Sequence, residues 1–249
     1  MFNLRKVQKA RNRLKITTDI LFKLFQISLR YKEKRKEYGI EIFEYFYLPW
    51  RDNNEFNNSF NKIKDYTLNP KSRLYSIFEL SKHYLKENTT FIEVGTWRGG
   101  VCGLISLANE DKKFDLYACD TFDGVKKSSQ YDSFFKDGEY SDTGISYIEK
   151  IQELIKHKIN FIEGIFPESM TNEIQNPISF AHIDVDTYFS AKESFEYISN
   201  RLIKGGVVVL DDYGGWFTDG VTRYGNELKN NSDYFVVPNH IGQLIIFKK

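Results

Sequence analysis

Paired carboxylates follow two apolar runs in the second half of the sequence. The stretch AHIDVDTYFS places Asp184 and Asp186 two residues apart after one such run, and GGVVVLDDYGG carries Asp211 and Asp212 after another. Alternate residues of an extended chain share a face, so His182, Asp184 and Asp186 are expected to point the same way. Ionised carboxylates at the edge of a core are costly unless they are paired, hydrogen-bonded or bound to a metal. The pattern therefore predicts a partner for these acids.

The spacing of the two pairs suggests where they meet. Asp184 precedes Asp211 by 27 residues, about the length of one helical crossover between parallel neighbouring strands. The two strand ends are then expected to lie side by side, and the clustered carboxylates to repel one another unless a hard divalent cation lies among them. Oxygen ligands favour Mg²⁺, with Mn²⁺ or Ca²⁺ as alternatives. In the competing interpretation Asp211 and Asp212 form a turn, and Asp184 is a helix N-cap.

A glycine-bearing turn follows an earlier apolar run. In FIEVGTWRGG, a strand is expected to end near Glu93, with Gly95 in the turn and a helix opening near Arg98 and Gly99. The glycines let a ligand approach the backbone, and the helix start offers free N–H groups. The pattern lacks the three glycines of G-x-G-x-x-G dinucleotide sites. Its acid suits a ligand that carries a positively charged amino group.

Another acid lies at the end of the next expected strand. In YACDTFDG, Asp120 has the position from which an acid binds ribose hydroxyls in doubly wound nucleotide sites. In the simpler interpretation, Asp120 or Asp123 is only a turn residue. Taken together, Glu93 and Asp120 favour a nucleoside-containing ligand.

The segments that must position these residues alternate between short apolar runs and helical patterns, which is typical of a parallel α/β sheet. Strands are predicted near residues 90–94, 115–119, 159–163, 178–184, 206–211, 233–238 and 242–248. Helices are predicted near residues 98–109, 145–157, 190–203 and 217–229. The sequence thus predicts five βα units with a terminal hairpin.

Length and composition exclude several classes of protein. The 249 residues fit one large domain with an appendage, and 35 basic residues nearly balance 34 acidic ones, so no nucleic-acid partner is indicated. Cys102 and Cys119 form no CxxC pair and are expected to be reduced core thiols of a cytoplasmic protein. No apolar run reaches the ~20 residues of a membrane span, and no signal peptide pattern is present.

The N-terminal part differs from the rest in charge. Residues 1–40 hold twelve Lys or Arg against three acids, with apolar residues at roughly helical spacing. This region is predicted to be a helix that contacts another subunit, lies on an anionic membrane or is simply solvated. The Asn-rich stretch 51–62 is predicted to be a loop. We therefore expect a helical, basic region over residues 1–70 and the main domain over residues 71–249.

Several stretches resemble a known family. FIEVGTWRGG, CDTFDG, FIEGIFPESM, the block from AHIDVDTY to LDDYG, and GQLIIFKK are similar to sequences of the macrocin O-methyltransferase family, over about residues 70–249. Its members include S-adenosylmethionine-dependent sugar methyltransferases of macrolide and aminocoumarin biosynthesis. The resemblance implies a Rossmann-like class I methyltransferase fold, with a mostly parallel seven-stranded sheet and a C-terminal antiparallel hairpin, and a homodimer or larger homo-oligomer.

The resemblance also implies roles for individual residues. The metal ligands would be Asp184, Asp211 and Asp212, with Asp186 as the catalytic base. The cofactor would be bound by Glu93, Gly95, Thr96, Arg98, Gly99, Asp120, Thr121, Gly164, Ile165, Phe166 and Asp184. This chain departs from the family pattern in having FSAKES after the D-x-D-x-Tyr motif, which leaves the acceptor open.

The implied function is Mg²⁺-dependent O-methylation of a sugar hydroxyl with S-adenosylmethionine. The expected acceptor is a nucleotide-activated sugar for bacterial surface polysaccharide, and the alternative is a small-molecule glycoside. Two other functional classes fit the sequence less well. A nucleotide-sugar dehydratase or epimerase needs Tyr-x-x-x-Lys, and Tyr147 lies one residue too close to Lys150. A non-catalytic scaffold protein is disfavoured by the full set of acids.

The polar segment 121–144 is too long for a plain connection. It is predicted to be either a lid over the acceptor or a surface loop, and these alternatives are evenly balanced. As a lid it would offer aromatic faces to a sugar, from Tyr131, Phe134, Phe135 and Tyr140. Lys126 and Lys127 would meet a phosphate, or would belong to a solvated basic turn.

Overall fold

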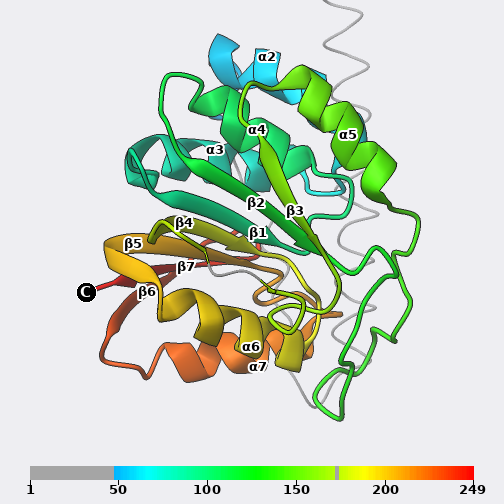
Figure 1. Cartoon of the computed structure of the whole chain (residues 1–249). Helices are drawn as coiled ribbons and strands as arrows, with labels where there is room; N and C mark the ends of the chain where they lie inside the picture. Colours follow the sequence, from blue (N-terminus) through cyan, green and yellow to red (C-terminus); the bar gives the residue numbers. More distant parts are fainter. Residues whose placement is uncertain (1–47, 172–173) are drawn as a thin grey trace, which may run out of the picture. The chain divides into compact units, whose positions relative to one another are not determined.

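The computed structural model describes residues 48–171 and 174–249, and Leu48–Lys249 form one compact unit. A seven-stranded sheet runs through it in the order β3-β2-β1-β4-β5-β7-β6 (Figure 1). The strands are β1 (Thr90–Val94), β2 (Asp115–Asp120), β3 (Ile159–Glu163), β4 (Ile178–Ile183), β5 (Leu202–Asp211), β6 (Tyr234–Pro238) and β7 (Gln243–Lys248). The first five pair in parallel, whereas β7 is antiparallel to both β5 and β6. The fold class and terminal hairpin expected from the sequence are confirmed.

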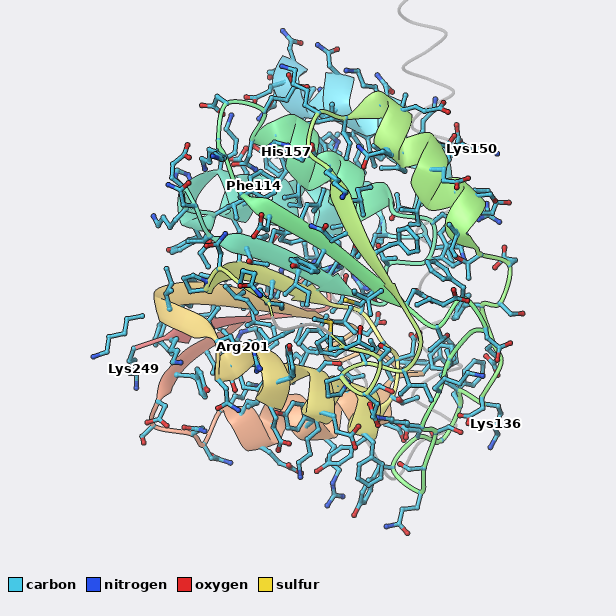
Figure 2. The ribbon with its side chains drawn as sticks, in the orientation of Figure 1. Phe114, Lys136, Lys150, His157, Arg201 and Lys249 are labelled. Atoms are coloured by element: carbon cyan, nitrogen blue, oxygen red, sulfur yellow. The ribbon has the colours of Figure 1, made fainter. Side chains whose placement is uncertain are left out.

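Helices cover both faces of this sheet (Figure 1). One face carries α2 (Asn54–Ile63), η1 (Lys64–Tyr66), α3 (Lys71–Tyr84), α4 (Gly100–Ala108) and α5 (Ile145–Leu154). The other carries α6 (Tyr188–Ser199) and α7 (Asp219–Leu228). A hydrophobic cluster lies on each side of the sheet. Figure 2 shows charged side chains such as Lys136, Lys150 and Lys249 projecting outward from this framework.

The stretch expected to be a loop at residues 51–62 is instead largely helix α2, so that prediction was wrong. Asn53 caps the helix, because its side chain accepts a hydrogen bond from the backbone N–H of Phe56 at 2.9 Å. Phe56, Phe60 and Ile63 recur at helical spacing, and Phe56 and Ile63 are fully buried. All nine residues of α4 are buried, and α2 packs against that helix. The asparagines on the outer face had obscured this apolar stripe.

Strand register brings the critical strand ends together. Val94 of β1 pairs with Ile183 of β4, and Ile183 pairs with Leu210 of β5. The residues that follow these strands therefore meet at one edge of the sheet, where the strand order reverses. β5 begins at Leu202, earlier than the 206 expected from the sequence, and a register shift lies between Ile178 and Phe180 in its pairing with β4.

The predictions made for the N-terminal basic segment lie outside the described residues. Residues 48–70 belong to the same compact unit as the sheet, and the division at residue 70 stays a prediction. Among the described helices, none has the length and apolar character needed to span a membrane.

Candidate active site

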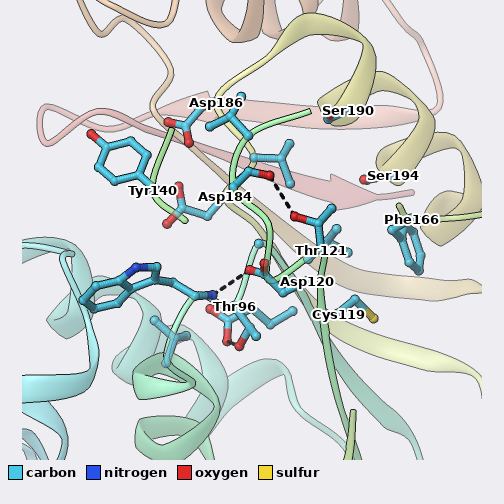
Figure 3. A pocket seen from close by; sticks show the side chains of 18 of the residues that line it. Thr96, Cys119, Asp120, Thr121, Tyr140, Phe166, Asp184, Asp186, Ser190 and Ser194 are labelled. Atoms are coloured by element: carbon cyan, nitrogen blue, oxygen red, sulfur yellow. Dashed lines mark hydrogen bonds between the residues drawn. The ribbon is translucent and has the colours of Figure 1, made fainter. Parts of the chain in front are cut away.

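A pocket opens at the carboxyl edge of the sheet, beside the ends of β1, β2 and β4 (Figure 3). Most of the residues singled out from the sequence line it, namely Glu93, Gly95, Thr96, Asp120, Thr121, Gly164, Ile165, Phe166, Asp184, Asp186 and Asp212. Arg98, Gly99 and Asp211 are not among the lining residues. The glycine turn at Gly95 therefore meets Asp184 and Asp186 after β4 and Asp212 after β5 in one pocket.

Gly95 allows the glycine turn to pass directly over β4. Its φ is +84°, and a Cβ there would lie 1.8 Å from the backbone oxygen of Asp184. No side chain fits at this position, because both the left-handed backbone and the close approach demand glycine. The turn and the Asp184 strand end are therefore held in contact.

The carboxylate of Asp120 lines the pocket and is held in place by two backbone N–H groups. Its Oδ2 accepts from the backbone N–H of Trp97 at 2.7 Å, and its Oδ1 from that of Phe122 at 2.8 Å. Burial raises the pKa of Asp120, although both backbone donors act against that rise. Each oxygen keeps a lone pair after accepting one bond, which suits two neighbouring hydroxyl donors.

Glu93 lies deeper, with its carboxylate surrounded by protein donors. Oε2 accepts from the Thr96 hydroxyl at 2.7 Å and from the Cys102 backbone N–H at 3.2 Å, and Oε1 lies 3.0 Å from Nδ1 of His182. The Cys102 thiol also donates to Oε2, at 3.0 Å. Glu93 therefore ties the glycine turn, α4 and β4 together beneath the pocket.

His182 bridges two buried carboxylates. Its Nδ1 faces Glu93, and its Nε2 lies 3.2 Å from Oδ2 of Asp211, with all three side chains almost inaccessible to water. Burial alone would lower the pKa of His182, but the hydrogen bonds to Asp211 and Glu93 outweigh it and raise that pKa to about 10. Both ring nitrogens of His182 thus have a carboxylate partner, and the imidazolium connects the glycine turn to the Asp211 strand end.

The carboxylates around the pocket crowd one another. Burial and the charges of Asp211 and Asp212 raise the pKa of Asp184 well above its usual value. Burial, the Asp212 charge and a hydrogen bond with Asp212 do the same for Asp186. Asp186 and Asp212 both adopt the left-handed backbone region, with φ of 62° and 64°. Residues in such conformations concentrate at functional sites, and here they turn both carboxylates into the pocket.

Two residues that the sequence did not suggest complete the cluster. Asn69 donates from Nδ2 to Oδ2 of Asp184 at 2.8 Å, and Arg73 pairs with Asp211 at 3.0 Å and Asp212 at 2.7 Å. Both precede the acids by more than 100 residues, in and just before α3. Nothing in their local sequence marks them, because only the packing of α3 against the sheet brings them to this edge.

The donor set is suited to a hard divalent cation. One carboxylate oxygen of Asp184 and one of Asp211 lie within 4.8 Å of each other and of a ring nitrogen of His182, and Asp186 and Asp212 add further carboxylates at the same edge. Because both ring nitrogens of the imidazolium are donors, the candidate ligands are the carboxylates and not His182. Burial, together with the neighbouring carboxylates, raises the pKa of both Asp184 and Asp186. Carboxylate oxygens are the ligands that Mg²⁺ prefers.

The segment 121–144 is attached firmly to the rest of the protein. Asp132 is only 7% exposed and accepts from the Ser129 backbone N–H at 3.0 Å and hydroxyl at 2.7 Å. It also accepts from the backbone N–H of Tyr188, the first residue of α6, at 2.8 Å. Arg98 donates to both the carbonyl and the carboxylate of Asp142 at 2.9 Å. Arg98 thus holds the far end of this segment against the glycine turn.

Only some side chains of this segment reach the pocket. Tyr140 and Lys126 line it, whereas Tyr131, Phe134 and Phe135 do not. Figure 3 places the Tyr140 ring beside Asp186. Lys127 pairs instead with Glu168 at 2.7 Å and with Glu193. Tyr140 is therefore the aromatic face of the segment that is available to a ligand in the pocket.

We expect Asp132→Ala to loosen this segment. Removing the carboxylate leaves the N-terminal N–H of α6 and the Ser129 donors without a partner, which should cost about 1–3 kcal/mol of unfolding free energy. Urea unfolding measures the stability change, and limited proteolysis should cut within residues 121–144 sooner than in the wild type. The exposed Asp233→Ala serves as the control. Wild-type stability and protease resistance in D132A would contradict this assignment.

We expect both cysteines to resist thiol reagents in the folded protein. Cys102 and Cys119 are fully buried, and burial raises the pKa of both thiols far above solution values. Ellman's reagent at pH 8 should therefore react with neither until denaturant is added. Rapid reaction of either thiol in native buffer would show that the region around Glu93 is open to solvent.

The sequence and the fold are both similar to those of known O-methyltransferases. The family model described as macrocin-O-methyltransferase (TylF) matches residues 61–237. A tetracenomycin-C 4'-O-methyltransferase from Streptomyces olivaceus, whose full name includes a dimethoxyrhamnosyl group, is 24% identical over 135 residues. That alignment covers 49% of this chain and 52% of the relative, so the chain spans about half the length of the curated relatives it matches.

Two solved structures share the fold. The O-methyltransferase NovP has a TM-score of 0.60 at 16% identity, covering 74% of this chain and 82% of its own. The calicheamicin methyltransferase CalS11 also has a TM-score of 0.60, at 15% identity, covering 86% of this chain and 99% of its own. Another structure of CalS11 is described as a TDP-rhamnose 3'-O-methyltransferase. These similarities establish the class I methyltransferase fold.

Proposed function

The chain belongs to the macrocin-O-methyltransferase family, and we propose that it transfers a methyl group from S-adenosylmethionine to a hydroxyl of a sugar-containing small molecule. This proposal rests on two sets of residues that line one pocket. The first set is the Glu93–Gly95 turn with Asp120, and the second set is Asp184, Asp186 and Asp212. The first set suits an amino acid joined to a nucleoside, and the second suits activation of a hydroxyl. A plain nucleotide-binding site would not need the second set.

The cofactor half of the pocket follows from the positions of its donors and acceptors. Asp120 offers both carboxylate oxygens to the ribose hydroxyls, while the turn at Gly95 and Thr96 lies beside the methionine part. Gly164, Ile165 and Phe166, after β3, would border the adenine. Arg98 and Gly99 would act less directly, Arg98 by holding Asp142 and with it the segment that carries Tyr140.

The reaction needs an acceptor oxygen held in line with the sulfonium methyl group, because the methyl group of the cofactor is already electrophilic. Asp186 would remove the hydroxyl proton, since it lines the pocket, and burial together with the neighbouring Asp212 raises its pKa above that of an isolated aspartate. Asp184, Asp211 and Asp212 would hold Mg²⁺. When bound, that ion would lower the pKa of the acceptor hydroxyl as a Lewis acid.

We propose a nucleotide-activated sugar for bacterial surface polysaccharide as the acceptor, with a natural-product glycoside as the second candidate. The description of CalS11 as a TDP-rhamnose methyltransferase of calicheamicin biosynthesis supports a nucleotide-linked sugar, and it does not bear on surface polysaccharide. The tetracenomycin-C relative supports the second. Tyr140 would stack on the sugar, and Lys126, which lines the same pocket, would meet a phosphate of the first class.

The test is a substrate screen read by mass spectrometry. The protein is incubated with S-adenosylmethionine and panels of nucleotide sugars and glycosides, with Mg²⁺ or with EDTA, and S-adenosylhomocysteine is measured. Acceptor-dependent product that EDTA abolishes would support both the reaction and the metal. Product that persists in EDTA would remove the metal from the reaction. Product formed from neither panel would contradict the assigned acceptor classes.

A further inference from the structure

Arg73 is a cation built into the carboxylate cluster. Its Nη1 lies 3.0 Å from Oδ1 of Asp211 and 2.7 Å from Oδ1 of Asp212, so one nitrogen bridges the two neighbouring acids. These are two of the three residues assigned to the metal. A divalent ion such as Mg²⁺ binds oxygen at about 2.0–2.1 Å. An ion that bound both oxygens would therefore need the space that the guanidinium nitrogen fills.

The surrounding structure is shaped to hold this side chain. Nε donates to the carbonyl of Ile241 at 2.8 Å, in the turn between β6 and β7. At the next residue, Gly242, a Cβ would lie 2.5 Å from Nη2 of Arg73, so the turn leaves room for the guanidinium only because it has no side chain there. The Arg73 side chain is 18% exposed. Contacts from three directions make this a defined position for the guanidinium.

Arg73 neutralises part of the negative charge of Asp211 and Asp212 in this position. The guanidinium is charged because arginine does not lose its proton in proteins, and its Nη1 lies within 3.0 Å of both Asp211 and Asp212. Asp184 has its own donor in Asn69. With Arg73 in place, Asp211 and Asp212 therefore already have a positive partner that a metal would have to replace.

We propose that Arg73 and a divalent cation are alternative partners of Asp211 and Asp212, so that Arg73 acts as an internal competitor that weakens cation binding. This inference rests on the metal site in the proposed function. A cation that enters the cluster displaces the guanidinium from both carboxylates. Because Arg73 lines the pocket, its freed guanidinium remains beside the acceptor site.

The test measures Mn²⁺ binding to the full chain, using the electron paramagnetic resonance signal of free Mn²⁺. We expect Arg73→Met to bind Mn²⁺ on the order of tenfold more tightly than the wild type, because a competing charge has been removed. Arg223→Met is the matched control, since Arg223 is an exposed arginine 3.6 Å from Glu227, outside the pocket. It should stay within about twofold of the wild type.

Equal or weaker Mn²⁺ binding by R73M would overturn the inference, as would the absence of Mn²⁺ binding in both proteins. Calorimetric titration of S-adenosylmethionine into the same samples separates this failure from failure of the proposed function. If S-adenosylmethionine binds while R73M leaves Mn²⁺ affinity unchanged, only the competitor role is lost. If S-adenosylmethionine does not bind, the methyltransferase assignment itself fails.

A second measurement uses the wild type and does not depend on R73M folding. The Nε–H resonance of Arg73 is assigned by its loss in Arg73→Lys and followed during a Mg²⁺ titration. We expect a saturable shift, because displacement from Asp211 and Asp212 changes the position of the whole guanidinium. A resonance that does not move up to millimolar Mg²⁺ would overturn the inference.

Discussion

Replacement of Asp186 by asparagine is expected to lower methyl transfer by about 10²–10⁴-fold, the range that a positioned general base contributes. The substitution removes the proton acceptor and little else. Asparagine tolerates the left-handed backbone found at residue 186, where φ is 62°. It also removes a charge that Asp212 opposes, so the fold should be at least as stable as the wild type.

The measurement is the turnover rate with a saturating acceptor, together with calorimetric binding of S-adenosylmethionine. Binding should stay within about threefold of the wild type, because Asp186 is the proposed base and is not among the residues proposed to bind the cofactor. Asp233→Asn, an exposed acid in the turn before β6, is the matched control. Normal turnover in D186N would remove Asp186 from the role of base.

The second large effect concerns stability. We expect His182→Leu to lower the free energy of unfolding by about 3–5 kcal/mol, the usual cost of leaving buried charges without their partner. Leucine fills most of the volume of the imidazole, but it donates no hydrogen bond to Glu93 or Asp211. Both carboxylates are at most 2% exposed, so water cannot replace the lost donors. Urea unfolding, followed by circular dichroism, measures the loss.

A triple variant tests whether the missing partner is the cause. Combining H182L with Glu93→Gln and Asp211→Asn removes both buried charges, and should recover part of the lost stability. His157→Leu provides a comparison, because that histidine lies at the far side of the sheet, near Phe114 (Figure 2). If H182L unfolds at the wild-type urea concentration, the two acids are not held by an imidazolium.

Much of the sheet could be predicted because each strand carries its own signal. Apolar runs separated by helical patterns predicted all seven strands, and the acids were found because each follows directly after such a run. The distance between Asp184 and Asp211 along the chain indicated neighbouring strands, and the β4–β5 pairing confirms this. Convergence at one edge then follows from the parallel arrangement alone.

Features that depend on distant packing could not be predicted in this way. Asn69 and Arg73 meet the acids only because α3 packs against the sheet. The apolar spacing of Leu74, Ile77 and Phe78 marks a buried helix face, but it does not show which edge of the sheet the start of that helix reaches. Asp211 and Asp212 looked equivalent, yet Asp211 points inward to His182 and Asp212 lines the pocket. Consecutive residues at a strand end point to opposite faces, so only one of the two could face His182.

The most direct test of the methyltransferase assignment is calorimetric titration of S-adenosylmethionine into the EDTA-treated full chain, repeated with Asp120→Ala and with the distant control Asp233→Ala. The account predicts one cofactor bound per chain in the wild type and the control. Affinity should fall at least about tenfold in D120A, because two carboxylate hydrogen bonds to the ribose are lost. Absence of binding to the wild type, or equal binding by D120A, would contradict the cofactor site placed at the ends of β1 and β2.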